Sequence, residues 1–396
     1  MIKSSFAKLI FACIALFAAG VASASSRAEV KKLIARGEQT HSAAVLLLRD
    51  GKQVGEYRDR DVGSQSIDLQ SATQSLVALG IGALLREGQL ESLDTPVYRF
   101  YPEWNQGRKR LVTVRMLLNQ TSGLHDDASV TATPPDVVRY ALAAELTSDP
   151  GETFSQSDAA VDLLMGIIGK AADIPADEYI ERELFARLGF QAASWQHDAA
   201  GNAPGSTGLT LSADDAAKIG QLVLDKGKWI DRQIVPESFI DEMLNPQTNQ
   251  SVEYGLLWMR TPAWIRLSVD AASIELIRKL ALQPDVVAKM SRLEGKSFDS
   301  SESLVAALHH VLSDDEFETF YATAQEHSIR MGTIFHLELG PMTAFSASGA
   351  GNFIVVVPQT RLVAVRLVTQ PNDEYDDFVE RVLDVAKSWD RSLKKH

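Results

Sequence analysis

Residues 68–75 read Asp-Leu-Gln-Ser-Ala-Thr-Gln-Ser and open an apolar stretch with helical periodicity that continues to Glu87. Gly88 follows, and glycine readily adopts the left-handed conformation that closes a helix. Ser71 lies on the first turn of this predicted helix, where free backbone N–H groups and the helix dipole can stabilise an oxyanion. Gln74 lies three residues later on the same face. The pair fits either a nucleophilic serine or an ordinary Ser-x-x-Gln capping box.

Val-rich segments near both ends of the chain predict one antiparallel sheet. The four candidate strands are residues 41–48, 54–57, 353–357 and 362–367. Asp50-Gly51 joins the first two strands as a tight hairpin turn. Residues 375–389 follow the last strand and form an amphipathic helix with one apolar face. The sheet is therefore expected to be built from both termini and flanked by helices.

The chain between these strands is predominantly helical. Helical patterns cover residues 159–171, 177–187 and 213–225. We therefore expect an α/β fold in which residues 25–70 and 241–396 form the sheet domain and residues 71–240 form an inserted, mostly helical domain. Besides the strands near the N-terminus, the sheet should take strands from residues 253–260 and 344–368.

Further segments along the chain extend the pattern that begins at residues 68–75. They are Gly88–Val97, Val114–Leu124, Pro150–Phe154, Leu184–Phe190, Gly208–Asp215, Tyr254–Trp258 and Ser348–Gly351. Together these segments resemble the β-lactamase-related serine hydrolases, which include class C β-lactamases, penicillin-binding-protein-like peptidases, related esterases and 6-aminohexanoate-dimer hydrolases. The resemblance covers roughly residues 41–260 and 341–390. It implies the serine β-lactamase fold, with Ser71 as the nucleophile.

Two positions that transfer protons in this family are substituted here. The family's first motif is Ser-x-x-Lys, and Gln74 stands at the position of the lysine. Its second motif is usually Tyr-x-Asn, and Gln156 and Asp158 stand at the positions of the tyrosine and the asparagine. A glutamine amide has no useful basicity near neutral pH, so neither glutamine can take the proton of the Ser71 hydroxyl.

The third motif of the family, commonly Lys-Thr-Gly, corresponds here to Ala347-Ser348-Gly349. The resemblance implies that this segment borders the site, with Ser348 at a catalytic position and with Ala347 and Gly349 against the substrate. It also implies an oxyanion hole formed by the backbone N–H groups of Ser71 and Ala350. Because these donors belong to the backbone, this part of the site is expected to survive the substitutions.

The substitutions leave two main functional hypotheses. The first is a pseudo-hydrolase that binds a small acyl or peptide-like ligand, or a protein partner, without efficient turnover. General acid–base catalysis contributes about 10²–10⁴-fold, and groups that act as a unit can lose nearly all of their effect together. The second is a slow or rewired hydrolase that forms an acyl-enzyme on Ser71 with Asp158 as the base. A purely structural scaffold is disfavoured, because it would gain nothing from the oxyanion geometry.

Asp158 also has a simpler interpretation. Its carboxylate can accept hydrogen bonds from Gln74 or from a backbone amide, and it acts as a base at neutral pH only if its pKa is raised. His125, directly after the family's Thr-Ser-Gly-Leu segment, is a further candidate proton carrier. A single loop histidine is, however, more often an ordinary surface residue.

About 85 residues separate Trp258 from Phe345, where the family has a short hairpin-like connection. Helical patterns cover residues 267–282, 284–290, 301–312 and 313–324. We therefore expect a helical insertion over residues 262–338. Residues 299–327 contain seven Asp or Glu residues and no Lys or Arg, so its outer face should be acidic. Because the chain re-enters the core just before Ala347, the insertion could cover the pocket, decorate the sheet or bind a partner.

The first 24 residues are predicted to be a signal peptide. Lys3 and Lys8 begin a segment that continues with the mostly apolar run Leu9–Ala22, and Ala22-Ser23-Ala24 fits a small-x-small cleavage site. The run is short for a stable membrane span, so a retained anchor is the less favoured alternative. We expect an exported, periplasmic or secreted protein with no membrane span after cleavage. Cys13, the only cysteine, lies in this segment, so the mature chain can form no disulfide.

Charge and composition argue against several classes of function. The 396 residues contain 39 Lys plus Arg and 52 Asp plus Glu, a formal net charge of −13. This excess of acid, without a basic stripe in the sequence, argues against binding to nucleic acid or to anionic membrane surfaces. The histidines His309, His310, His327 and His336 show no recognisable metal-ligand spacing, so we expect neither a metal nor another cofactor.

Overall fold

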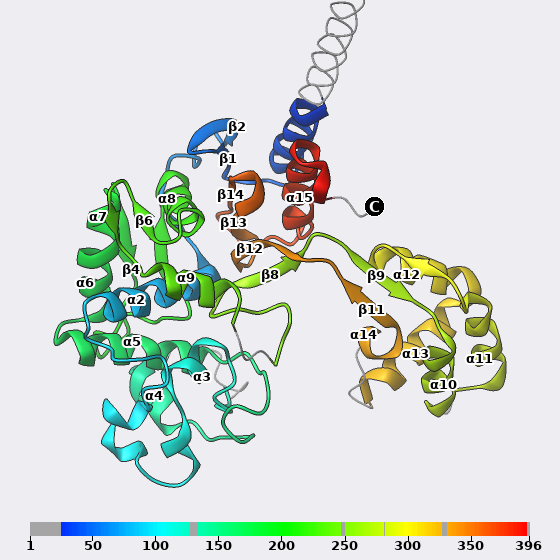
Figure 1. The fold of residues 1–396 in the computed structure, drawn as a ribbon, viewed down its shortest axis with the longest axis horizontal. Coiled ribbons are helices and arrows are strands. Elements are labelled where there is room, and N and C mark those ends of the chain that lie inside the picture. The colour runs from blue at the N-terminus through cyan, green and yellow to red at the C-terminus, as the bar shows by residue number, and fades with distance from the viewer. Residues whose placement is uncertain (1–24, 127–133, 247–249, 281, 327–330, 394–396) are drawn as a thin grey trace, which may run out of the picture. The chain divides into compact units, whose positions relative to one another are not determined.

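The computed structural model describes residues 25–126, 134–246, 250–280, 282–326 and 331–393 (Figure 1). The predicted signal peptide, with Cys13, and His327 lie outside the described residues. The chain divides into two compact units. The first contains the described residues up to Thr261 together with Thr343–Arg391, and the second contains Pro262–Met342. Among the described residues, no helix is both long enough and apolar enough to cross a membrane.

The first unit contains a six-stranded sheet with the strand order β2-β1-β14-β13-β12-β8. Its strands are β1 (Ala44–Arg49), β2 (Lys52–Arg58), β8 (Met259–Pro262), β12 (Met342–Gly349), β13 (Asn352–Val357) and β14 (Leu362–Leu367). The pairs β2–β1, β1–β14, β14–β13 and β13–β12 are antiparallel. The prediction of a sheet built from both ends of the chain is therefore confirmed.

The sequence predicted the β1–β2 hairpin at one edge of the sheet better than the strand at the other edge. Asp50 and Gly51 have φ values of 51° and 70°, which suit the tight hairpin turn expected between β1 and β2. The strand expected over residues 253–260 is wrong in its first half. Tyr254 pairs with Met259 in a local bridge, so the chain turns back on itself before β8 begins.

Helices cover both faces of the six-stranded sheet (Figure 1). The covering helices are residues 25–39, α15 (Phe378–Trp389) and α8 (Ala213–Leu224). Neighbouring residues of β13 point to opposite faces. The ring of Phe353 packs against Phe378 of α15, with ring centroids 5.4 Å apart. Ile354 instead faces α8, where a Cβ on Gly220 would lie 3.3 Å from its side chain. Glycine at this position therefore allows α8 to approach the sheet closely.

The remainder of the first unit is mainly helical. Its helices are α2 (Gln74–Arg86), α3 (Val114–Leu118), α4 (Val137–Ala143), α5 (Asp158–Ala172), α6 (Ala176–Ile180), a π-helical turn (Glu181–Phe185), α7 (Ala186–Leu188) and α9 (Glu237–Leu244). It also contains short strands that were not predicted, namely β3 (Ile67–Asp68), β4 (Ala193–Trp195), β5 (Leu209–Leu211), β6 (Lys228–Trp229) and β7 (Arg232–Gln233). The buried helix α2 packs against α5. Its α-helical part begins at Gln74 rather than at Ser71, and Gly88 follows its end with a φ of 69°.

The second unit contains the segment predicted as an insertion and has its own hydrophobic core. Its elements are β9 (Ile265–Ser268), α10 (Ala271–Lys279), α11 (Pro284–Met290), β10 (Ser297–Phe298), α12 (Ser301–Val311), α13 (Asp314–Glu326), α14 (Met331–Ile334) and β11 (His336–Leu339). The strands pair in the order β10-β9-β11. Fully buried side chains such as Ile277, Leu308 and Phe320 form the core together with their neighbours.

One helix of this unit was predicted with the wrong start. Residues 267–282 were expected to be helical throughout, but Leu267 belongs to strand β9 and the helix begins only after Asp270. The Asp270 carboxylate accepts the Ser273 N–H at 2.8 Å, an N-terminal cap that fixes this start. The capping box predicted at Ser313 is present, because Glu316 accepts the Ser313 N–H at 2.8 Å.

We expect the first unit to fold without the second. Replacing residues 264–340 with a short Gly/Ser turn should leave a cooperatively folded protein, because the core of the second unit consists of its own residues. The ends to be joined already lie close together, since the Ala263 N–H donates to the Pro341 carbonyl at 2.9 Å. Near-UV circular dichroism and thermal unfolding measure the outcome. Loss of cooperative unfolding would contradict the division into separately packed units.

The same variant tests the expectation that the insertion covers the pocket. Labelling of Ser71 by small acylating reagents should change when the insertion is removed, and it is followed by intact mass. Labelling at the rate of the parent by a folded variant would mean that the insertion does not control access to Ser71.

Candidate active site

Ser71 lies in a 3₁₀ turn, Gln70–Thr73, directly before α2. Gln70 has a φ of 52°, a left-handed conformation that is unfavourable for a residue with a side chain. Its N–H donates to the Asp68 carboxylate at 2.8 Å, which holds this change of chain direction. The side chain of Ser71 is exposed, and its hydroxyl makes no hydrogen bond to any described residue. The serine is therefore presented to solvent without a hydrogen-bonded base.

The end of strand β12 lies against the backbone of Ser71. A Cβ atom on Gly349 would lie 2.6 Å from the Ser71 nitrogen and 2.5 Å from the Ala72 nitrogen, so only glycine fits without a shift of the backbone. Asn352, at the start of β13, donates from its side chain to the Asp68 carbonyl at 3.2 Å. The structure thus places the predicted third motif beside Ser71, with the sheet tied to the segment that carries the serine.

The three residues of this motif differ in their accessibility. Ser348 and Gly349 are partly exposed, whereas Ala347 is fully buried in the sheet. The side chain of Ala347 is therefore not open to a ligand, although the resemblance implied that it would contact the substrate.

A two-residue turn, Ala350-Gly351, joins β12 to β13. The φ values are 50° and 94°, and the value for Ala350 again requires support from its surroundings. The Asn372 N–H donates to the Ala350 carbonyl at 3.1 Å, and Arg366 Nη1 donates to the Gly351 carbonyl at 2.8 Å. Arg366 is fully buried, and burial lowers the pKa of Arg366 to about 10. The turn that carries the expected oxyanion donor is thus held by a buried guanidinium.

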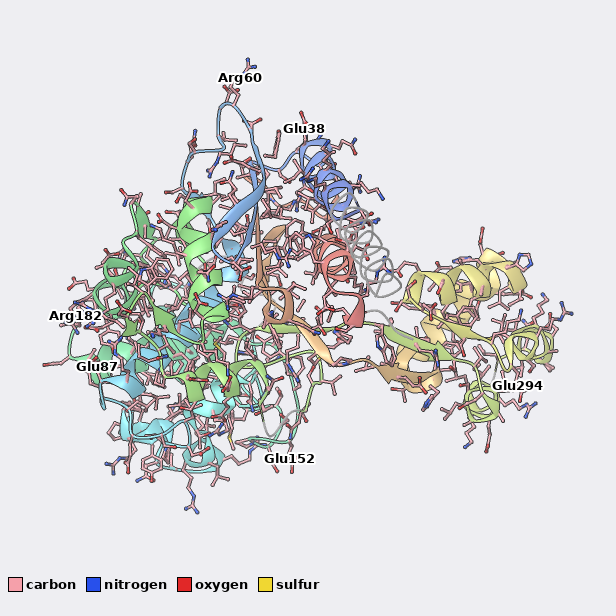
Figure 2. The ribbon with its side chains drawn as sticks, turned by 45° about the horizontal axis from the view of Figure 1, so that its top comes forward. Glu38, Arg60, Glu87, Glu152, Arg182 and Glu294 are labelled. Atoms are coloured by element: carbon pink, nitrogen blue, oxygen red, sulfur yellow. The ribbon has the colours of Figure 1, made fainter. Side chains whose placement is uncertain are left out.

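Gln74 and Asp158 are in direct contact. Gln74 Nε2 donates to Asp158 Oδ1 at 3.0 Å. Gln74 is the first residue of α2 and Asp158 is the first residue of α5, so the bond joins the first turns of two packed helices. Gln156 is exposed, makes no hydrogen bond to any described residue, and lies before α5 on the same loop as Glu152 (Figure 2). Gln74, at the family's lysine position, therefore binds Asp158, whereas Gln156 binds no described residue.

Asp126 is a site residue that the sequence analysis missed. Its Oδ1 accepts the Ser157 hydroxyl at 2.9 Å and the Ala159 N–H at 3.1 Å, and its Oδ2 accepts the Asp158 N–H at 2.6 Å. A carboxylate in this position caps α5 and is favoured by the helix dipole. The available signal was its place directly after His125, whose own side chain is exposed. Arg366 and Asn372 were also missed, and no local motif marks them.

Acidic groups gather at the start of α5. Partial desolvation raises the pKa of Asp158, the negative charge of Asp126 raises it further, and the hydrogen bond from Gln74 opposes the shift. The Asp158 side chain nevertheless still reaches solvent. One turn later, Asp162 accepts two backbone N–H groups from residues 205–206, at 2.8 and 3.0 Å, and burial raises the pKa of Asp162 to about 6. Both shifts favour the protonated form of these carboxyls.

Metal chemistry has no visible basis in the part of the chain that the structure describes. There, no group of three or more His, Cys, Asp or Glu residues is arranged so that it could hold a metal ion. The described histidines of the second unit, His309, His310 and His336, form no such group either.

Comparisons with known proteins identify the family of the chain. A model of the family described as Beta-lactamase matches residues 30–386 of the chain. The chain is 29% identical over 188 residues to Protein flp of Staphylococcus aureus (strain COL), which is 40% of this chain and 37% of that protein. It is 22% identical over 231 residues to the 6-aminohexanoate-dimer hydrolase of Paenarthrobacter ureafaciens, which is 53% of this chain and 58% of that protein. The chain thus spans less than two thirds of the length of either relative.

A solved structure gives the same result for the fold. The penicillin binding protein from Bacillus halodurans superposes with a TM-score of 0.56, covering 90% of this chain and 99% of that protein at 14% identity. At this identity the similarity concerns the fold alone.

Gly349→Ala tests the close approach of β12 to Ser71. The added methyl group would overlap backbone atoms that cannot move independently, so we expect the free energy of unfolding to fall by about 1–3 kcal/mol. Ser348→Ala is the matched control, because this neighbour is partly exposed, and it should change stability by less than about 0.5 kcal/mol. Urea unfolding measures both variants. Equal stability of the Gly349→Ala variant and the parent would contradict the described contact.

Asp162 gives the protein a specific dependence on pH. Because its pKa rises from 3.8 to about 6 on folding, the folded state binds the proton more tightly than the unfolded state. The stability from this group is therefore present below pH 4 and is lost as pH rises through 6, by up to about 3 kcal/mol. Asp162→Asn keeps an oxygen acceptor but removes the charge, so this loss between pH 4 and 7 should disappear.

The control for this prediction is Glu178→Gln, an exposed carboxylate in α6. It should leave the pH dependence of unfolding as in the parent. Urea unfolding at four pH values between 4 and 7 measures the three proteins. An unchanged slope in the Asp162→Asn variant would show that Asp162 does not titrate as the structure indicates.

Proposed function

The chain belongs to the beta-lactamase family, and from this premise we propose that it is an exported pseudo-hydrolase. In this proposal the pocket at Ser71 binds a small acyl or peptide-like ligand and turns it over slowly or not at all. The observation that carries the proposal is the hydrogen bond from Gln74 to Asp158. It engages the residue at the family's lysine position in a contact that cannot move protons.

Proton transfer is the step that the arrangement does not support. The Ser71 hydroxyl has no hydrogen-bonded base among the described residues, and a serine hydroxyl without a base is a weak nucleophile. Gln74 donates through its amide nitrogen, and its amide oxygen is not basic enough to deprotonate a hydroxyl. Gln156, at the tyrosine position, is a second amide. Both groups that would accept and return the serine proton are thus replaced by groups that cannot.

Binding, in contrast, is supported by the parts of the site that do not need a base. The segment Ser348–Gly351 lies beside Ser71, and the turn at Ala350 is held by Asn372 and Arg366. In the proposed oxyanion hole, the backbone N–H groups of Ser71 and Ala350 would bind a carbonyl or carboxylate oxygen of the ligand. A ligand with such a group could occupy the site and leave unchanged.

The proposed location and partners follow from the sequence. Residues 1–24 have the pattern of a signal peptide, which favours a periplasmic or secreted protein. One of the relatives is named as a hydrolase of 6-aminohexanoate dimers, an amide-bonded compound, which favours a peptide-like ligand. A protein partner bound through the acidic helices of the insertion is a further possibility within the proposal.

One observation favours a second candidate, a slow or rewired hydrolase with Asp158 as the base. A carboxylate is a better base when its pKa lies closer to neutrality, and both desolvation and Asp126 raise the pKa of Asp158. In such an enzyme, Asp158 would take the Ser71 proton as the hydroxyl attacks the acyl carbon, and it would then return the proton to the leaving group. This candidate requires ester or amide turnover that disappears in Ser71→Ala.

The proposal predicts that nitrocefin turnover is absent or very slow. Gln74→Lys combined with Gln156→Tyr should then accelerate the acylation of Ser71 by penicillin about 10²-fold or more, because it restores groups that can transfer protons. Intact mass spectrometry over time measures the acyl-enzyme. Efficient nitrocefin turnover by the parent, lost in Ser71→Ala, would overturn the pseudo-hydrolase proposal.

The matched control is Gln74→Met combined with Gln156→Phe, which resembles the restoring pair in size but cannot transfer protons. It should acylate no faster than the parent. If the control and the restoring pair react equally, the effect comes from pocket shape rather than from proton transfer. If neither reacts faster, the two glutamines do not explain the lack of turnover.

A further inference from the structure

The first unit contains a cavity formed by elements other than those at Ser71. It has a volume of about 570 Å³ and lies between helix 25–39, the hairpin β1–β2 and the C-terminal end of α15. Helix 25–39 and α15 lie side by side in both views (Figure 1, Figure 2). The Ser26 hydroxyl donates to the Ser388 carbonyl of α15 at 3.2 Å, and the hydroxyl of Tyr375, in the turn before α15, donates to the Leu33 carbonyl at 3.2 Å. The walls of the cavity are therefore fixed relative to each other.

The cavity is lined by three cations and by no acidic residue. Arg27 and Lys31 come from helix 25–39, and Arg49 comes from the end of β1. None of the three forms an ion pair or a side-chain hydrogen bond with any described residue. The chain as a whole carries a formal net charge of −13. Three unpaired cations around one cavity are a local reversal of the overall charge.

One of these cations is already oriented. The guanidinium carbon of Arg49 lies 4.6 Å from the centroid of the Trp389 ring, a cation–π contact that fixes the group in position. The N–H groups of this guanidinium make no hydrogen bond to any described residue and remain available as donors. A planar set of free N–H donors is suited to a carboxylate or a phosphate.

Apolar side chains lie directly beside the cations. Val30, Val54 and Trp389 line the same cavity, and Val54 is 42% exposed although it is a large hydrophobic residue. Exposed apolar surface next to unpaired cations matches a ligand with an acidic head and a hydrocarbon chain. The cations would bind the head, and the chain would cover Val54.

We propose that this cavity binds an anionic amphiphile, a carboxylate or phosphate group attached to a hydrocarbon chain. The attraction between the three cations and the anionic head acts at short range and is screened by salt, so binding should weaken as salt is added. The sequence did not show this site, because its cations come from separate segments and form no linear basic stripe. The proposal is independent of the chemistry at Ser71.

Decanoate is the probe for this proposal, used below its micellar concentration with the purified protein, whose N-terminus is first determined by intact mass. Isothermal titration calorimetry should show saturable binding to one site that weakens with added sodium chloride. Butyrate, with the same head and a shorter chain, should bind at least about tenfold more weakly. Octyl glucoside, which has a chain but no charge, should not bind. Inorganic phosphate tests whether the site recognises only the anionic head. Such a site would bind phosphate as tightly as decanoate.

The decisive variant is Arg27→Gln/Lys31→Gln/Arg49→Gln, which should weaken decanoate binding at least about tenfold. Its matched control is Arg99→Gln/Lys228→Gln/Arg232→Gln, which removes the same charge from cations outside the cavity and should bind as the parent does. Val54→Ser should reduce the preference for decanoate over butyrate and leave butyrate binding unchanged. Thermal unfolding confirms that each variant is folded.

Four results would overturn the proposal. The first is decanoate binding by the cavity variant with the affinity of the parent, and the second is equal loss in the control variant. The third is binding of octyl glucoside as tight as that of decanoate. The fourth is an absence of any decanoate binding by the folded parent.

Discussion

The hydrogen bond from Gln74 to Asp158 is the interaction on which the chemistry of this protein depends. It joins the first residues of α2 and α5, so it lies where the two helices that carry the first and second family motifs meet. Asp126 caps α5 at the same place, and desolvation together with the negative charge of Asp126 raises the pKa of Asp158. The two positions from which the family's hydrolases move protons are thus held by amides, Gln74 and Gln156, and Gln74 is bound to a carboxylate. The serine next to them keeps its exposure but has no hydrogen-bonded base.

Two residues of the site keep strained backbone conformations. Gln70 and Ala350 both adopt positive φ values, each of which costs about 1–2 kcal/mol for a residue with a side chain. Asp68 supports the first, and Asn372 and Arg366 support the second. Strained conformations persist only where the surrounding structure holds them, and they cluster at functional sites. The retention of this geometry beside Gln74 and Gln156 supports the proposal of a protein that binds at the site without reacting.

The sequence predicted the elements that depend on local or repeating patterns. The hairpin at Asp50-Gly51, the end of α2 at Gly88 and the capping box at Ser313 follow from turn and cap chemistry, and the structure contains all three. Ordered motifs predicted the fold, and they indicated which residues gather at Ser71. Contacts between distant segments were not predictable in this way. Arg366 beneath the Ala350 turn, and Asp126 at the start of α5, have roles that appear only when the chain is folded.

Other errors arose where a pattern had two physical explanations. Leu267 fits a helical face as well as a strand, and only the cap at Asp270 decides where the helix starts. Residues 253–258 are apolar enough for a strand, yet they form a tight loop that leads to β8.

The most direct test of the account is the pH dependence of Ser71 labelling by a fluorophosphonate, measured by intact mass for the parent and for Asp158→Asn. If Asp158 only accepts the hydrogen bond from Gln74, labelling is slow, and both proteins show the same rate at every pH. Fast labelling of the parent, with an inflection above pH 4 that disappears in Asp158→Asn, would contradict the account. That result would identify Asp158 as the base of an active hydrolase.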